Sequence, residues 1–192
     1  MEVLRAMNGL QAQFLANALH AMRLRSTAYD AAHAADGLVK GWTLRGTMHI
    51  FAEADLPLFL HSGCRYRSRD WTVPSFWNQR PDWALTPQRQ TYFSDLIVDV
   101  LTQGPLTREA LKDRCRAAGM TQAEEDSMFH SWGGGIRELC ERGFLCGTVS
   151  EEKAFRLCPA FIPMEEQDAL LEQTRRYFTN YGPASVRDAA YY

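Results

Sequence analysis

Two glutamines near the amino terminus, Gln11 and Gln13, have a type and spacing that could support chemistry. They follow Gly9 and are separated only by Ala12. In an extended backbone, residues two apart point to the same side, so both amides would face one side of the chain. Paired neutral amides can hold a water molecule or a sugar oxygen by hydrogen bonds. The same spacing also fits two surface or capping glutamines, and the pair alone does not distinguish these interpretations.

A second group of polar residues lies between Leu44 and His49. His49 could contact a phosphate or a base, or it could be a strand histidine whose ring is satisfied by a backbone carbonyl. Arg45 could pair with a phosphate, or with an internal carboxylate such as that of Glu53 or Asp55. The residue types leave both alternatives open.

A basic and aromatic segment follows at residues 65–71, where Arg65, Arg67 and Arg69 alternate with Tyr66 and precede Trp71. Arginines interleaved with aromatic rings suit a surface that follows phosphates and stacks on bases. A solvated loop after a helix explains the same composition nearly as well.

Composition and charge limit the class of protein. The 192 residues suffice for one large or two small domains, and 46% hydrophobic with 23% charged residues is typical of a globular chain. A net charge of -2 weakens a nucleic-acid hypothesis without excluding it, because the distribution of charge matters more than its sum. No apolar run reaches bilayer length and no signal-peptide core follows the first residues, so we expect a cytoplasmic protein.

The cysteines and histidines predict no metal or cofactor. Five cysteines without C-x-x-C spacing are an odd number, and they fit buried free thiols in a reducing compartment. The histidines outside the segment of His49 show no ligand spacing, and no phosphate-binding, dinucleotide-binding or zinc-protease motif is present.

Residues 86–161 predict three helices followed by a β-hairpin. Thr86-Pro87 begins the first helix, which ends at Gly104-Pro105, and Thr107 begins the second. A capping box, Thr121 to Glu124, opens the third, in which the run from Gly133 to Gly135 marks a break or a close contact. We expect the third helix to bury Phe129, Trp132, Ile136, Leu139 and Cys140. Strand-like runs at 144–149 and 154–157 complete the order of a winged helix.

The pattern recurs on both sides of this module. We expect another helix after this module, with an apolar face of Leu170, Leu171, Tyr177 and Phe178. It ends at Gly-Pro-Ala-Ser, residues 182–185, which repeats the Gly-Pro-Leu-Thr of residues 104–107. This copy stops inside its expected second helix, so we expect the natural protein to be longer. Upstream we expect helices at 15–24 and 28–38, strands within 42–51 and a helix at 55–65, a winged helix that has lost its first helix.

The predicted fold class is therefore mainly α with small β-hairpin wings, in tandem winged helix-turn-helix modules. Residues 1–85 form the first module with a connecting helix, 86–162 the second, and 163–192 a truncated third.

Three elements in this order carry a family resemblance: residues 9–13, Gly-Leu-Gln-Ala-Gln; residues 44–49, Leu-Arg-Gly-Thr-Met-His; and residues 181–184, Tyr-Gly-Pro-Ala. Together they resemble the winged-helix family of AlkZ- and YcaQ-like bacterial DNA glycosylases, which unhook interstrand crosslinks and remove alkylated bases. The resemblance covers essentially the whole chain, and the Leu-Arg-Gly-Thr-x-His element is its most specific match. Compared with the family's pattern, we expect this chain to lack the first helix of the first module and most of the third module.

The resemblance implies a monofunctional glycosylase acting on damaged duplex DNA, with Gln11 and Gln13 as catalytic residues and Arg45, His49, Arg65, Arg67 and Arg69 as candidates for DNA contact. An N7- or N3-alkylated purine is already cationic and leaves without a strong general acid, through a transition state resembling an oxocarbenium ion. Gln13 would position the attacking water, and Gln11 would orient it or contact the sugar.

Two alternatives remain, a non-catalytic DNA-binding module and a protein-interaction scaffold, and fold alone does not choose among them. The third helix of the 86–162 module carries five carboxylates against Arg137 and Arg142, which makes a poor reader of the major groove. Sequence-specific regulation is therefore disfavoured for that module. The oligomeric state is not determined by the sequence.

Overall fold

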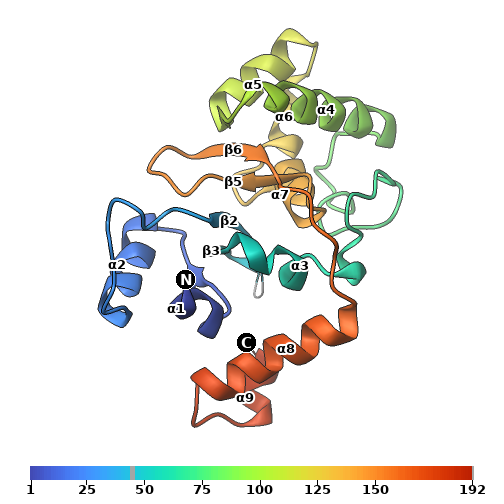
Figure 1. Cartoon of the computed structure of the whole chain (residues 1–192). Coiled ribbons are helices and arrows are strands. Elements are labelled where there is room, and N and C mark those ends of the chain that lie inside the picture. The colour runs from blue at the N-terminus through green and yellow to red at the C-terminus, as the bar shows by residue number, and fades with distance from the viewer. Residues whose placement is uncertain (44–45, 192) are drawn as a thin grey trace. The chain divides into compact units, whose positions relative to one another are not determined.

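A computed structural model describes residues 1–43 and 46–191 and divides them into two compact units (Figure 1). The first unit contains residues 1–66, 149–151 and 160–192. The second contains residues 67–148 and 152–159. The chain's carboxy-terminal part therefore shares a unit with its amino-terminal part, which the expected order of modules along the sequence did not anticipate.

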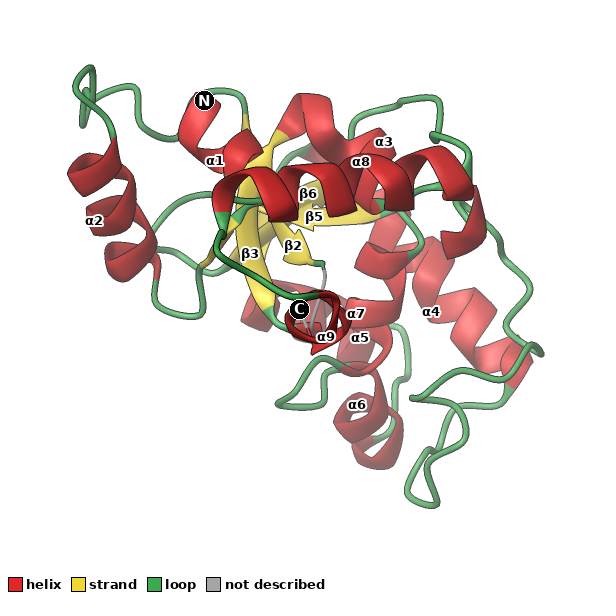
Figure 2. Cartoon of the chain, turned by 90° about the horizontal axis from the view of Figure 1, so that it is seen from below, coloured by secondary structure: helices red, strands yellow, loops and turns green. Residues whose placement is uncertain are grey.

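The first unit combines helices with a small antiparallel sheet, whose strands lie in the order β1-β3-β2. Leu10 pairs with Ile50 between β1 and β3, and Val39 pairs with Phe51 between β2 and β3. Helix α8 packs against α1 and α3, and the three helices lie close together when the chain is seen from below (Figure 2). The elements of this unit are α1 (Glu2–Ala6), β1 (Leu10–Gln11), α2 (Leu15–Arg25), β2 (Leu38–Trp42), β3 (Met48–Ala52), α3 (Leu56–Phe59), α8 (Glu166–Asn180) and α9 (Val186–Tyr191).

Two helices expected in this unit are absent or shortened. The helix predicted at 28–38 was wrong, because these residues form turns before β2. Ser26 and Asp30 accept hydrogen bonds from nearby backbone N–H groups, and the exposed alanines offer no apolar face to bury. The helix predicted at 55–65 is reduced to the four residues of α3, followed by a short 3₁₀ turn, Ser62–Cys64. A short helix, α1, does precede the first strand.

The second unit follows the predicted order of caps closely. Thr86 accepts a hydrogen bond from the backbone N–H of Arg89, and Thr107 accepts one from Ala110. Thr121 and Glu124 form the predicted capping box. The elements are α4 (Pro87–Val100), β4 (Leu106–Thr107), α5 (Arg108–Ala117), α6 (Gln122–Met128), α7 (Gly134–Glu141), β5 (Leu145–Gly147) and β6 (Ala154–Leu157).

The expected third helix of this unit is broken into α6 and α7 at the glycine run. Gly134 has a φ of 62°, and a Cβ there would lie 2.2 Å from the carbonyl oxygen of Ser127, so only glycine allows this approach. Trp132 lies in the break with its side chain 74% exposed, so the prediction that it packs inward was wrong. Phe129, Ile136, Leu139 and Cys140 are buried as predicted.

The predicted hairpin is present: β5 pairs with β6, Cys146 opposite Arg156, and β4 extends the ladder on the far side of β6. The architecture is therefore mixed, with helices and antiparallel strands in both units, rather than mainly α. The described residues contain no helix long and apolar enough to cross a membrane. The five cysteines form no disulfides, and burial raises the pKa of Cys115 to about 12.

The capping box of α6 leads us to predict that the second unit becomes less stable in acid. Hydrogen bonds from Arg89, at 2.5 and 2.8 Å, lower the pKa of Glu124 to about 2 against the opposing effect of burial, and Thr121 adds further hydrogen bonds. Since the folded pKa lies below the usual value of 4.5, this stabilisation is complete above about pH 4.5 and is lost as the pH falls towards 2.

We expect Glu124→Gln to lower the free energy of unfolding by about 1–2 kcal/mol at pH 7. The difference from the parent should shrink between pH 4.5 and pH 2, as measured by urea denaturation across that range. Glu151→Gln, at an exposed turn, is the control and should change little. If Glu124→Gln stayed less stable than the parent by the same amount down to pH 2, the low pKa of Glu124 would be contradicted.

Candidate active site

Gln11 lies on the edge strand β1, which is extended as predicted, and Gln13 lies just beyond it, where the chain bends before α2. Leu10 and Ala12 are buried, whereas Gln11 and Gln13 are exposed. Gln11 pairs with His49 on β3, and the N–H of Ala12 donates to the carbonyl oxygen of Met48 at 2.8 Å. The two amides therefore stand on either side of a buried alanine that anchors the strand.

A tight turn at Asn8 and Gly9 delivers the chain from α1 into β1. Both residues have positive φ angles, 50° and 86°, and the N–H of Gly9 donates to the carbonyl oxygen of Leu4 at 2.7 Å. A Cβ at Gly9 would lie 3.0 Å from the carbonyl oxygen of Ile50. The turn therefore requires glycine for its conformation and for the close approach of β3.

Helix α8 fixes this turn from the other end of the chain. The Asn8 side chain, only 2% exposed, donates to the carbonyl oxygen of Gln173 at 2.9 Å. The Tyr181 hydroxyl, just after α8, donates to the carbonyl oxygen of Met7 at 2.9 Å. The Gln173 side chain donates in turn to the carbonyl oxygen of Leu58 on α3, at 2.8 Å. Sequence analysis missed this support, although Asn8-Gly9 is itself a turn signal.

A buried ion pair anchors the same helix. Arg176 donates two hydrogen bonds of 3.0 Å to the carboxylate of Asp55, and both residues are buried. Arg176 also donates to the carbonyl oxygen of Arg5 at 3.3 Å and to Glu172 at 2.7 Å. Asp55 is thus engaged by Arg176, and Arg5 lies 3.5 Å from the same carboxylate.

His49 is 7% exposed, and its Nδ1 lies 2.9 Å from the carbonyl oxygen of Thr47. A carbonyl can only accept, so Nδ1 carries the proton of this hydrogen bond. This contact is the one expected of a strand histidine satisfied by the backbone. The register also places His49 directly across the ladder from Gln11, on the same face of the sheet.

The predicted basic segment is divided between the two units. Arg65, with a φ of 54°, belongs to the first unit and is exposed, while Arg67 and Arg69 belong to the second. Arg67 donates to the carbonyl oxygen of Cys158 at 3.2 Å, and Arg69 forms an ion pair with Asp95. Arg45 lies outside the described residues.

Trp71 and Tyr66, expected to interleave with these arginines, pack inward instead of presenting stacking surfaces. The Trp71 side chain is 3% exposed beneath the guanidinium of Arg142, whose Cζ lies 4.1 Å from the centroid of the Trp71 ring. The Tyr66 ring lies 4.5 Å from that of Phe161.

The acidic residues of α6 and α7 are paired with arginines inside the second unit. Besides the pair of Arg89 with Glu124, the carboxylates of Glu125, Glu138 and Glu141 accept hydrogen bonds of 2.6–2.7 Å from Arg116, Arg142 and Arg137 respectively. These helices therefore use their charges to hold the unit together, which agrees with a scaffold and not with a reader of bases.

The exposed amide pair of the first unit can donate and accept hydrogen bonds but cannot exchange protons at neutral pH. It is suited to positioning a water molecule beside a centre where positive charge develops. Among the described residues, no three histidine, cysteine, aspartate or glutamate side chains group as metal ligands would.

The family described as "DNA glycosylase AlkZ-like" matches residues 4–192, and the chain belongs to it. The interstrand DNA cross-link repair glycosylase of Streptomyces sahachiroi is 27% identical over 198 residues, which cover 96% of this chain and 52% of that protein. The structure of the DNA glycosylase AlkZ from the same organism is similar in fold, with a TM-score of 0.71 at 24% identity over the same shares. The chain spans about half the length of these relatives.

The turn before β1 gives a test of how the amide pair is placed. We expect Gly9→Ala to destabilise the first unit by about 1–2 kcal/mol from the left-handed conformation, and by more from the clash with β3. Gly119→Ala is the matched control, because Gly119 has a φ of 83° but nothing within 4 Å of an added Cβ.

Urea denaturation should show the larger loss at Gly9, and amide hydrogen exchange should rise at Gln11 and His49 only in that variant. Equal losses in the two variants would show that the close approach of Ile50 does not hold β1.

Proposed function

We propose that this chain is part of a DNA glycosylase that hydrolyses the N-glycosidic bond of alkylated or crosslinked purines in duplex DNA. The observation that carries the proposal is the placement of Gln11 and Gln13, exposed on either side of a buried residue on a strand held from both ends of the chain. The names of the relatives, a cross-link repair glycosylase above all, support DNA as the substrate. We place the protein in the bacterial cytoplasm, where such DNA is found.

The mechanism follows from what neutral amides can do. Gln13 accepts a hydrogen bond from a water molecule and aims its oxygen at the anomeric carbon, while Gln11 orients that water or contacts the sugar. The bond to the base breaks with its electron pair leaving on the cationic purine, which becomes neutral as it departs. Water adds to the sugar and loses a proton to solvent. Neither glutamine is a general base, so uncharged bases remain poor substrates.

His49 is proposed to act beside Gln11. The register places His49 opposite Gln11, and the hydrogen bond of its Nδ1 to the carbonyl oxygen of Thr47 fixes its ring there. Arg65 of the first unit, Arg67 and Arg69 of the second, and Arg45 remain proposed phosphate contacts. Arg69 would have to exchange its pairing with Asp95 for a phosphate.

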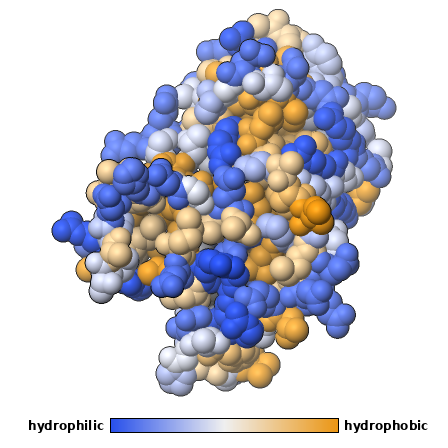
Figure 3. All heavy atoms as spheres, in the orientation of Figure 1, coloured by the Kyte–Doolittle hydropathy of each residue, from blue (hydrophilic) through white to orange (hydrophobic). Residues whose placement is uncertain are grey.

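The alternative of a protein-interaction scaffold would call for a continuous apolar face. On the face drawn in Figure 3, hydrophobic residues lie in groups separated by hydrophilic ones. The tandem winged-helix organisation remains our interpretation of the cap and hairpin pattern.

The decisive experiment is base release from a duplex that carries an N7-alkylguanine. We expect release by the parent, reduced about a hundredfold or more in Gln13→Ala, because that variant loses an interaction made to the attacking water. Gln167→Ala is the matched control, since Gln167 is an exposed glutamine of the same unit on α8.

Binding of the duplex without release, by a protein of the full length of its relatives, would contradict catalysis and indicate a non-catalytic DNA-binding module. Equal loss of activity in Gln13→Ala and Gln167→Ala would show that the amide of Gln13 has no special role.

A further inference from the structure

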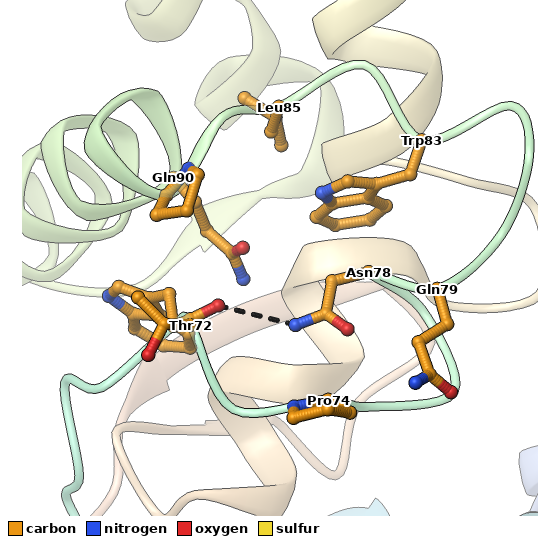
Figure 4. A pocket seen from close by; sticks show the side chains of 9 residues that line it. Thr72, Pro74, Asn78, Gln79, Trp83, Leu85 and Gln90 are labelled. Carbon is orange, nitrogen blue, oxygen red and sulfur yellow. Dashed lines mark hydrogen bonds between the residues drawn. The ribbon is translucent and has the colours of Figure 1, made fainter.

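A hollow of about 300 Å³ lies within the second unit, and its volume is at the lower end of the range of small-molecule sites. Trp71, Trp83 and Leu85 supply apolar walls, Gln90 projects from α4, and Thr72 and Gln79 lie at the exposed rim (Figure 4). Trp71 belongs to the basic and aromatic segment predicted from the sequence, but none of the predicted catalytic glutamines, arginines or His49 lines the hollow.

The wall of the hollow is a long but firmly held loop, residues 65–86, that contains no helix or strand along its fully described length. Asn78 is its centre: the amide nitrogen donates to the carbonyl oxygens of Trp71 and Val73, at 3.2 and 2.9 Å, and the amide oxygen accepts from the N–H of Ser75 at 2.7 Å. The N–H of Ala84 donates to Ser127 on α6 at 2.9 Å. Ordered loops of this length usually serve binding or catalysis.

Two tryptophans that line the hollow have unused indole donors, and that of Trp83 faces an acceptor. The indole N–H of Trp83 is buried and has no hydrogen-bond partner among the described residues, and the same holds for Trp71. Gln90 donates its amide nitrogen to Glu138 at 3.0 Å, which leaves its carbonyl oxygen for the hollow. Figure 4 shows the indole nitrogen of Trp83 and the amide of Gln90 projecting towards each other from opposite walls. A buried donor without an acceptor is unfavourable unless an occupant satisfies it.

The hollow carries no net charge. No acidic or basic side chain lines it. Glu138, behind Gln90, is neutralised by Arg142 through a hydrogen bond of 2.6 Å, and the same arginine covers the ring of Trp71. An occupant would therefore be uncharged, flat enough to lie against indole rings, and able to accept from Trp83 while donating to Gln90.

We propose that this hollow binds an uncharged heteroaromatic ring whose edge carries an acceptor beside an N–H donor, the chemistry that nucleobases share. The ring would pack against the apolar walls, and its edge would satisfy Trp83 and Gln90 together. The site would be distinct from the amide pair of Gln11 and Gln13, and it does not require that the chain release bases.

The test follows the indole N–H resonances of the whole ¹⁵N-labelled chain during titration with 9-methyladenine. We expect a saturable shift of the Trp83 resonance, which the Trp83→Phe variant identifies by its absence. Binding to Trp83→Phe, followed by the ligand's own signals, should be about fivefold to tenfold weaker, because one hydrogen bond is lost while the ring remains. Trp132→Phe, which changes an exposed tryptophan outside the hollow, should bind like the parent.

Two outcomes would overturn the proposal. If naphthalene, a flat ring without polar edge groups, binds as tightly as 9-methyladenine, the hollow is merely apolar. If no probe saturates while the parent and both variants remain folded by circular dichroism, the hollow holds water only.

A single-stranded oligonucleotide distinguishes the source of the ring. If the oligonucleotide competes with 9-methyladenine for the parent but binds more weakly to Trp83→Phe, the hollow accepts a base within a strand. Binding of the free base alone would indicate a released base or a similar small molecule. Because the readout is binding, either result stands apart from the outcome of the base-release experiment.

Discussion

The ion pair of Arg176 with Asp55 is the constraint on which the first unit depends. Both side chains are buried, so each charge would be strongly destabilising without the other. The two hydrogen bonds of 3.0 Å between them fix where α8 lies against the turn that precedes α3. With α8 fixed, the carbonyl oxygen of Gln173 accepts a hydrogen bond from Asn8, and the hydroxyl of Tyr181 donates to the carbonyl oxygen of Met7. These contacts hold the turn that immediately precedes β1 and the two glutamines.

This arrangement suits a mechanism in which the protein supplies position and the substrate supplies reactivity. Neutral amides gain most when their geometry is set before the substrate arrives, since they neither store nor release a proton. An edge strand held by its neighbour β3 and by a helix from the far end of the chain provides such a fixed geometry. The proposed substrates meet this requirement, because alkylated purines carry their own leaving-group charge.

In the second unit many of the chain's charges are paired internally. Its helices are rich in carboxylates, but four of these are engaged by arginines within the unit, and Arg89 is anchored at the capping box of α6. Because many charges are paired inside the unit, the formal net charge of -2 does not indicate the electrostatic potential that the surface presents to a partner. The same pairing shields Gln90 from the charge of Glu138 and leaves an uncharged hollow beside it.

Local signals in the sequence determined much of the second unit. Thr86, Thr107 and the Thr121–Glu124 box begin helices where predicted, and the strands at 145–147 and 154–157 form the expected hairpin. Such caps and turns act over three or four residues, so they can be recognised without knowing the fold. The extended backbone at Gln11 and its exposure follow from the same local alternation.

Tertiary structure decided the rest. Trp132 fits a helical stripe but is exposed, because the glycine run breaks the helix to bring Gly134 against Ser127. The alanines of 28–38 favour a helix by propensity, but no apolar face of theirs is buried, and turns form instead. Nothing local links Asn8 to Gln173, which are 165 residues apart. The sequence by itself therefore determined the caps, the hairpin and the chemistry of the amide pair, whereas only long-range packing determined what holds that pair in place.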